Sequence, residues 1–317
     1  MAPYRYITVL LLLAVAWGVI MGAIGQKYYG FGNLLETIGI HYRPPFYPVQ
    51  RPAPNPVDTS DIIPKVFQGK LALFILAGQS NMSGYGILPS EQVIDSRVFA
   101  FGNNYRWRTA QEPIDDPAGQ VDPISMDGDA GVGPALAFAR FLRKRNPDLV
   151  IGLIPCAKGA STIEEWQRHL SDNTLYGSCL KRIQAATTMG ELAGMLVFQG
   201  EQDALDPQQA LDRTLSASDY TAKFSRFVND LRRDIARPKL PVVFAQIGTH
   251  KAPNAFINWE MIQKQQTMVD LSCAAMITTD DLALQDGVHF NTESYRIIGE
   301  RYAEAIWRLM IQAQDCH

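Results

Sequence analysis

Three side chains that lie far apart in the chain have the types and spacing needed for nucleophilic catalysis. Ser80 lies within the segment Gly78–Met82, whereas Asp286 and His289 are three residues apart near the C-terminus. A serine hydroxyl is a weak nucleophile until a base removes its proton, and a carboxylate improves that base by fixing its tautomer. Within one turn, Asp286 could reach one imidazole nitrogen and leave the other to face Ser80. We therefore predict Ser80, Asp286 and His289 as a catalytic triad for acyl transfer.

Acyl transfer also needs hydrogen-bond donors for the oxyanion that forms on the attacked carbonyl group. Ser80 lies where a predicted strand gives way to a helix, so its backbone amide could face that oxygen. Gly159 allows close backbone approach, and Gln199 carries a side-chain NH2 group. We expect Ser80, Gly159 and Gln199 to form the oxyanion hole. We expect Glu201 to support the neighbouring loop through hydrogen bonds and not to act as a general acid.

From Lys70 onward, short apolar runs alternate with longer segments of helical periodicity, which is typical of parallel strands joined by crossover helices. The predicted strands are Leu71–Ala77, Val150–Cys156, Gly194–Phe198, Leu240–Ile247 and Cys273–Thr278. The predicted helices are Pro134–Arg145, Leu180–Thr188, Ala217–Ile235, Trp259–Leu271 and Thr292–Gln312. This order predicts a single α/β domain with a doubly wound, five-stranded parallel sheet and helices on both faces.

The candidate residues follow the carboxyl ends of the predicted strands, where ligands bind in open parallel sheets. Gly78–Met82, Ala157–Ser161 and Gln199–Asp203 each follow a strand, and Asp286–His289 lies beyond the last one. We therefore expect these segments to meet at one edge of the sheet. The stretch Phe99–Gly133 is rich in Asp, Gly and Pro and has weak periodicity, so it is expected to form a long lid or binding loop.

The N-terminal part of the chain has a composition of its own. The uncharged and mostly apolar run Tyr6–Gly25 matches the roughly 20 residues that cross a bilayer as a helix. Residues 1–30 are therefore expected to be a membrane anchor, with a signal peptide as the alternative. A proline-rich spacer at residues 31–69 and the catalytic domain at residues 70–317 follow. We expect an exported domain, which is membrane-anchored outside the cytoplasm, or secreted or periplasmic if the segment is cleaved.

Charge and metal-ligand patterns disfavour several classes of partner. The chain has 29 basic and 32 acidic residues, a formal net charge of -3 and no block of like charges, so a nucleic-acid partner is not expected. Neither a His-x-x-x-His pair nor a Cys-x-x-Cys pair is present, so we expect no metal and no other cofactor. Cys156, Cys179, Cys273 and Cys316 could form one or two disulfides in an exported chain or stay buried thiols.

The segments Gly78–Met82 (GQSNM), Gln199–Asp203 (QGEQD) and Asp286–His289 (DGVH) resemble conserved blocks of the SGNH hydrolases, specifically the sialate O-acetylesterase and carbohydrate esterase family 6 branch. The resemblance spans about Lys70 to Arg308. It implies a flavodoxin-like three-layer α/β/α sandwich, with Ser80 as nucleophile, Asp286 and His289 as orienter and base, and Ser80, Gly159 and Gln199 as oxyanion donors. It also implies a serine esterase that removes O-acetyl groups from a carbohydrate, either acetylated polysaccharide or sialic acid, through an acyl-enzyme.

Two other functions are open at this point. A membrane-tethered glycan O-acetyltransferase could use the same triad, because a sugar hydroxyl can replace water as acyl acceptor. A noncatalytic glycan-binding protein that kept the fold is disfavoured, since every required catalytic group is present. The sequence leaves open the acetylated sugar that is bound and the oligomeric state.

Overall fold

A computed structural model describes residues 63–209 and 215–311. These residues belong to the compact unit Asn55–His317. Within these two ranges, no helix is long and apolar enough to cross a membrane. The apolar run Tyr6–Gly25 and most of the spacer at residues 31–69 lie outside them, so the membrane anchor and the domain bounds stay predictions.

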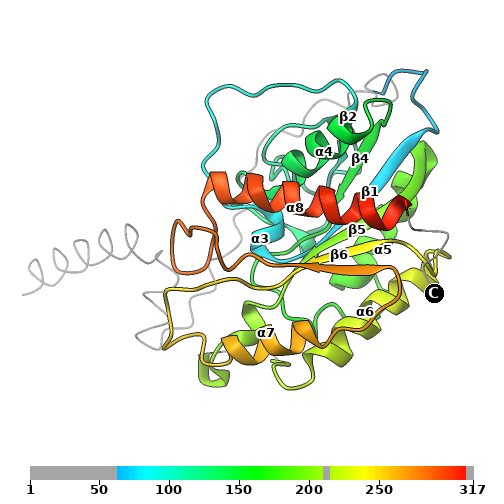
Figure 1. The fold of residues 1–317 in the computed structure, drawn as a ribbon. Helices are drawn as coiled ribbons and strands as arrows, with labels where there is room; N and C mark the ends of the chain where they lie inside the picture. Colours follow the sequence, from blue (N-terminus) through cyan, green and yellow to red (C-terminus); the bar gives the residue numbers. More distant parts are fainter. Residues whose placement is uncertain (1–62, 210–214, 312–317) are drawn as a thin grey trace, which may run out of the picture. The chain divides into compact units, whose positions relative to one another are not determined.

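A seven-stranded sheet forms the centre of the domain (Figure 1). In spatial order its strands are β3 (Trp107–Thr109), β2 (Val98–Phe101), β4 (Ile151–Pro155), β1 (Leu71–Gly78), β5 (Gly190–Phe198), β6 (Val242–Ala245) and β7 (Ala274–Ile277). β3 pairs antiparallel with β2, and every other neighbouring pair is parallel. All residues of β2, β4 and β6 are buried, as expected for strands that helices cover on both faces.

The prediction of a five-stranded, all-parallel sheet is wrong, because the sheet has seven strands and is mixed. The five predicted strands are present as β1, β4, β5, β6 and β7. Numbered in chain order, they lie in the order 2-1-3-4-5, as in flavodoxin-like folds. The missed strands β2 and β3 are four and three residues long. Such short strands show no recognisable periodicity in a stretch rich in turn residues.

Helices cover both faces of the sheet. They are α4 (Pro134–Arg145), α5 (Leu175–Ala186), α6 (Tyr220–Asp234), α7 (Trp259–Thr267) and α8 (Thr292–Ile311). α4 and α8 pack against each other on one face, whereas α6 and α7 lie side by side on the other (Figure 1). The bounds predicted for α4 are confirmed. α5 begins at Leu175 and not at Leu180, because the Thr174 side chain accepts a hydrogen bond from the Gly177 amide and caps the helix.

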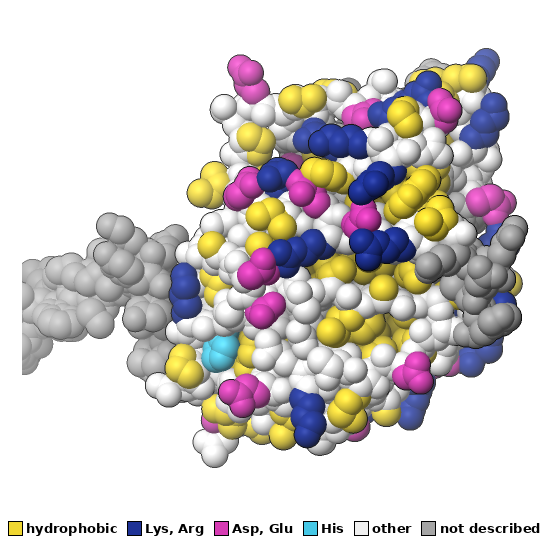
Figure 2. Space-filling model, viewed as in Figure 1, with side chains coloured by type: hydrophobic (Ala, Val, Ile, Leu, Met, Phe, Trp, Pro, Cys, Tyr) yellow, Lys and Arg dark blue, Asp and Glu magenta, His cyan; other side chains and the backbone are white. Residues whose placement is uncertain are grey.

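The face that carries α8 shows charged side chains of both signs next to one another (Figure 2). Along α8, Arg296 pairs with Glu293 and Glu300, and Arg308 pairs with Glu304. Such exposed pairs contribute little stability, but they leave this face without a patch of a single sign.

A disulfide joins Cys156, directly after β4, to Cys179 in α5, with a Cα–Cα distance of 5.3 Å. Both cysteines are almost completely buried. The bond ties the carboxyl end of β4 to the neighbouring helix, just before the segment that contains Gly159. One of the cysteine pairings that the sequence left open is thereby settled, while Cys316 lies outside the described residues.

Candidate active site

Ser80 is positioned by the abrupt end of β1. Gly78 has a φ of 128°, and a Cβ atom there would lie 2.0 Å from the carbonyl oxygen of Phe198 in β5. Only glycine allows the two strand ends to come this close. The Gln79 amide then donates to the same carbonyl oxygen at 2.8 Å, and the short helix α3 (Ser80–Ser83) follows. Ser80 therefore occupies the first position of a helix at the carboxyl edge of the sheet.

The segments after β1, β4 and β5 are hydrogen-bonded to one another at this edge. The Lys158 amide donates to the Gly78 carbonyl oxygen at 3.0 Å. Gln79 Oε1 accepts from the amides of Gly200 and Gln202, both at 3.3 Å. The predicted meeting of these three segments is confirmed.

Ser80, His289 and Asp286 form a continuous row of hydrogen bonds. Ser80 Oγ lies 2.9 Å from His289 Nε2, and His289 Nδ1 lies 2.8 Å from Asp286 Oδ2. With the proton on Nδ1, the imidazole donates to Asp286 and its Nε2 accepts from the Ser80 hydroxyl. Ser80 is 6% exposed and the His289 side chain 18% exposed, whereas the Asp286 side chain is 48% exposed, so the row leads from a buried hydroxyl to a carboxylate at the surface. The structure brings together the three residues that the sequence predicts as a triad.

Asp286 is held as a carboxylate by its surroundings. Burial alone would raise the pKa of Asp286, but hydrogen bonds from the His289 ring and from two backbone amides lower the pKa to about 2. The amides belong to Val288 and His289 and lie 2.9 and 2.7 Å from Asp286 Oδ1. Asp286 is consequently ionised at neutral pH and can hold the orientation and the tautomer of the imidazole ring.

Asn81 connects the elements that carry Ser80 and His289, and it was not among the residues predicted from the sequence. Its Nδ2 donates to Glu201 Oε1 at 2.6 Å and to the Val288 carbonyl oxygen at 3.2 Å. Its Oδ1 accepts from the hydroxyl of Tyr295 in α8 at 2.7 Å. Asn81 thus joins the turn after β1 to the turn after β5 and to the loop of His289. The only signal in the sequence was its place directly after Ser80.

Glu201, which the sequence analysis expects to support the site, is buried in the turn after β5. It is 2% exposed, and its Oε2 atom has no hydrogen-bond partner among the described residues. Burial raises the pKa of Glu201, while the hydrogen bond from Asn81 and the charge of His289 act in the opposite direction. Glu201 is linked to the loop of His289 through Asn81, which agrees with a supporting position.

Gly159 follows β4 as predicted, but its amide is occupied. It donates to Asp127 Oδ2 at 2.9 Å, and Ser83 Oγ donates to the same oxygen at 3.1 Å. Asp127 belongs to the stretch Phe99–Gly133 and is buried. The position of Gly159 after a strand could not reveal that a distant loop supplies this acceptor. A substrate oxygen could use the Gly159 amide only in competition with Asp127.

Gln199 is also committed to internal hydrogen bonds. Its Nε2 donates to Asp203 Oδ2 at 2.6 Å and to the Ser161 carbonyl oxygen at 3.2 Å, which uses both amide hydrogens. The Ser80 amide, as the first of helix α3, has no intrahelical acceptor. Of the three predicted oxyanion donors, Ser80 therefore needs no rearrangement, whereas Gly159 and Gln199 would each have to give up a bond.

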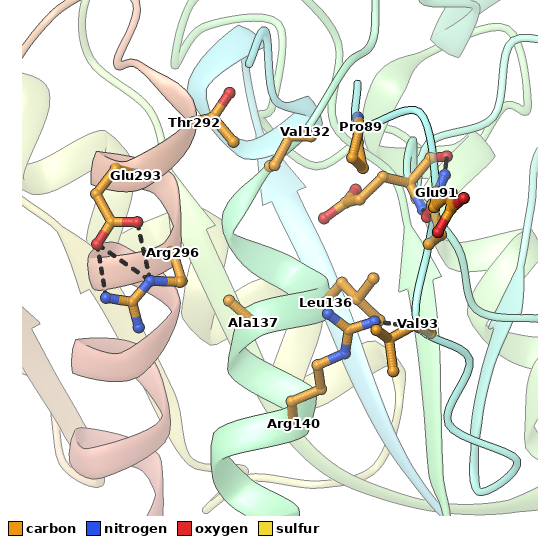
Figure 3. A pocket seen from close by; sticks show the side chains of 13 residues that line it. Pro89, Glu91, Val93, Val132, Leu136, Ala137, Arg140, Thr292, Glu293 and Arg296 are labelled. Carbon is orange, nitrogen blue, oxygen red and sulfur yellow. Dashed lines mark hydrogen bonds and ion pairs between the residues drawn. The ribbon is translucent and has the colours of Figure 1, made fainter. Parts of the chain in front are cut away.

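A groove with a volume of about 250 Å³ lies between the segment 89–93, α4 and the start of α8 (Figure 3). Its lining combines the apolar side chains of Pro89, Val93, Val132, Leu136 and Ala137 with the charged side chains of Glu91, Arg140, Glu293 and Arg296. None of the triad residues lines it. Thr292 also lines the groove, and it is the first residue of α8, three positions after His289. Its Oγ1 accepts a hydrogen bond from the Ile87 amide. The groove therefore lies beside the row formed by Ser80, His289 and Asp286 and does not contain that row.

Comparison with known proteins places the chain in a family. Residues 70–308 match the carbohydrate esterases described as sialic acid-specific acetylesterases. A probable carbohydrate esterase from Arabidopsis thaliana is 31% identical over 254 residues, which cover 74% of this chain and 89% of that protein. The X-ray structure of that protein has a TM-score of 0.63 at 30% identity and covers 76% of this chain and 99% of its own. A carbohydrate acetylesterase from Xanthomonas citri shares the fold, with a TM-score of 0.59 at 19% identity over 76% of this chain and 57% of that one.

The matched region contains the whole seven-stranded sheet and all the candidate residues. The chain belongs to the carbohydrate esterase family of sialic acid-specific acetylesterases. It is a carbohydrate O-acetylesterase, and the resemblance to the sialate O-acetylesterase branch of the SGNH hydrolases is confirmed.

Proposed function

We propose that this chain hydrolyses O-acetyl esters of a carbohydrate through an acetyl-Ser80 intermediate. The observation that carries the proposal is the row of Ser80, His289 and Asp286, with hydrogen-bond distances of 2.9 and 2.8 Å. The row supplies a nucleophile, a base and an orienting carboxylate, which are the groups that acyl transfer from an ester requires.

In the acylation step, Ser80 Oγ attacks the carbonyl carbon of the acetyl ester, and its proton passes to His289 Nε2. The π electrons of the carbonyl group move onto the oxygen, where the Ser80 amide at the start of α3 donates a hydrogen bond. The bond from the carbonyl carbon to the sugar oxygen then breaks, and His289 returns the proton to that oxygen. The products of this step are acetyl-Ser80 and a free sugar hydroxyl.

In the deacylation step, His289 removes a proton from a water molecule that attacks the acetyl carbon. The bond to Ser80 Oγ breaks, the proton returns to that oxygen, and acetic acid leaves and ionises to acetate in solution. Asp286 stays ionised throughout, because its role is to stabilise the imidazolium form of His289 and not to accept its proton.

The Ser80 amide is the first oxyanion donor in this proposal. Gly159 can serve as the second when the substrate oxygen takes the place of Asp127 Oδ2, which now accepts from the Gly159 amide at 2.9 Å. Gln199 would have to release Asp203 Oδ2, to which it donates the shorter of its two hydrogen bonds. A role of Gln199 as donor therefore needs the larger rearrangement.

The disulfide between Cys156 and Cys179 supports a domain that works outside the cytoplasm, because such bonds persist in oxidising compartments. The apolar run Tyr6–Gly25 would export or anchor the chain in this proposal. Fractionation of cells that express the full chain tests it, since recovery of the folded protein in the cytosol with free thiols would contradict an exported enzyme.

The description of the family supports O-acetylated sialic acid as the first substrate to test, and the relative named a probable carbohydrate esterase supports testing other acetylated carbohydrates as well. An acetate-release assay with the full chain on O-acetylated sialic acid, acetylated plant polysaccharide and acetylated bacterial envelope glycan compares them directly. We expect acetate release from at least one of them. Isotope-labelled acetyl groups that appear on an added unacetylated glycan would instead show acetyl transfer, and the absence of any release would contradict the proposal.

A further inference from the structure

The ring of Tyr85 lies flat on the imidazole of His289. The ring centroids are 4.2 Å apart, and the two planes differ by 7°. In this arrangement Tyr85 covers one face of the imidazole, whereas the edge atoms Nδ1 and Nε2 stay in their bonds to Asp286 and Ser80. The contact therefore restricts the plane of the base without competing for either of its nitrogens.

The turn at Gly84 and a hydrogen bond from Gln285 fix the backbone of Tyr85 in the position that allows its ring to stack on His289. Gly84 ends helix α3 with a φ of 90°, and a Cβ atom there would lie 2.3 Å from the Gly133 Cα atom, so only glycine permits this turn. The Tyr85 carbonyl oxygen accepts a hydrogen bond from Gln285 Nε2 at 2.6 Å. Since Gln285 directly precedes Asp286, the segment that carries Tyr85 is tied to the loop that carries the acid and the base.

The electrostatics of this contact change during the reaction. Burial and the nearby carboxylates of Asp127, Asp129 and Asp286 raise the pKa of Tyr85, so its ring stays a neutral phenol. The face of such a ring carries partial negative charge and attracts cations. His289 becomes a cation when it takes the proton of Ser80, and at that moment the Tyr85 face attracts it more strongly than in the resting enzyme.

We propose that Tyr85 is a positioning residue, which fixes the plane of the His289 imidazole and stabilises its imidazolium form through the face of its ring. This inference rests on the proposed function, because it assigns to His289 the role of the base. The ring of Tyr85 stabilises His289 mainly after the imidazole has taken the proton of Ser80. This interaction therefore lowers the barrier to acylation and leaves substrate binding almost unchanged.

The first test measures kcat and KM of the full chain with p-nitrophenyl acetate. Tyr85→Leu removes the aromatic face and is expected to lower kcat about tenfold, with KM changed less than about twofold. Tyr85→Phe keeps the face and is expected to recover most of that loss. Tyr105→Leu is the matched control, because Tyr105 packs edge-on against Phe101 and not against the triad. Equal losses in Tyr85→Leu and Tyr85→Phe would show that the hydroxyl matters and would overturn the role of the ring face, as would an unchanged kcat in Tyr85→Leu.

The second test keeps the shape of the ring, so it remains decisive if Tyr85→Leu does not fold. Phenylalanine and 3,4,5-trifluorophenylalanine are incorporated at position 85, because fluorine withdraws the negative charge from the ring face. We expect a further severalfold fall in kcat with the fluorinated ring, with the same KM. Equal kcat values for the two rings would overturn the stabilisation of the imidazolium.

Ser80→Ala is measured in parallel with both tests. Activity retained in Ser80→Ala would reject the proposed function itself, whereas an inactive Ser80→Ala with a fully active Tyr85→Leu would reject only the role of Tyr85.

Discussion

Asn81 Nδ2 lies 2.6 Å from Glu201 Oε1, and this hydrogen bond joins the turn after β1 to the turn after β5 next to Ser80. The second oxygen of Glu201 is buried without a hydrogen-bond partner among the described residues. A buried carboxylate with half of its acceptor capacity unused is costly when charged. We therefore expect Glu201 to make the free energy of unfolding depend on pH.

Glu201→Gln should reveal this dependence. Burial raises the pKa of Glu201 above its ordinary value of 4.5, so the native state binds this proton more tightly than the unfolded chain does. As the pH rises from about 4.5 through the raised pKa, the native protein should lose free energy of unfolding relative to Glu201→Gln. Urea unfolding of both proteins from pH 5 to pH 8 measures the difference. A constant difference would show that Glu201 is charged in the native state over the whole range.

Ser80→Ala should abolish the esterase activity while the protein stays folded. The loss expected in kcat is at least about a thousandfold, because only the nucleophile is removed. Ser83→Ala is the matched control in the same short helix, since Ser83 bonds Asp127 and lies outside the catalytic row. Turnover of p-nitrophenyl acetate, together with circular dichroism, gives the comparison. Near-normal turnover of a folded Ser80→Ala would remove Ser80 from the mechanism.

Asp286→Asn should lower kcat by about 10⁴-fold, because the amide favours the wrong tautomer of His289. Asp281→Asn serves as the control, since Asp281 pairs with Arg301 away from Ser80 and His289.

The same variant should also change the dependence of stability on pH. The pKa of Asp286 is lowered from its ordinary value of 3.8 to about 2, so the ionised carboxylate stabilises the native state above pH 3.8, and this stabilisation is lost as the pH falls toward 2. Unfolding midpoints of wild type and Asp286→Asn should therefore converge on acidification, and a gap that persists at pH 2 would contradict this pairing.

Gln199→Leu distinguishes a structural role from an oxyanion donor. The Gln199 amide bonds the buried Asp203 carboxylate, so its removal should lower the free energy of unfolding by about 1–3 kcal/mol. Loss of an oxyanion donor would lower kcat by about 10²–10³-fold. Because both amide hydrogens of Gln199 are used in internal hydrogen bonds, we expect Gln199→Leu to lower the free energy of unfolding and to reduce kcat less than about tenfold. A stable variant with a hundredfold lower kcat would assign Gln199 to the oxyanion hole.

The elements that could be predicted from the sequence are those whose apolar pattern extends over several residues. The five parallel strands that carry the site and α4 follow from apolar periodicity, and Ser80, Asp286 and His289 follow from chemistry and from their places after strands. β2 and β3 are too short to carry a pattern, so the mixed edge of the sheet was missed. The hydrogen bond between Asp127 and Gly159 joins residues 32 positions apart, and no local pattern encodes such a contact.

Tyr85 illustrates the same limit. Its place two residues after the end of α3 carries no signal in the sequence, because the contact with His289 depends on tertiary structure. The turn at Gly84 and the hydrogen bond from Gln285 bring the two rings together, and Gln285 lies 200 positions away along the chain.

The most direct test of the account is peptide mapping by mass spectrometry after a rapid acid quench of the enzyme during turnover of an acetylated sugar. An acetyl-Ser80 intermediate adds the mass of one acetyl group to the peptide that contains Ser80, and this modification should form and disappear at rates that match acetate release. Release of acetate while the Ser80 peptide stays unmodified, or acetylation of another residue at the rate of turnover, would contradict it.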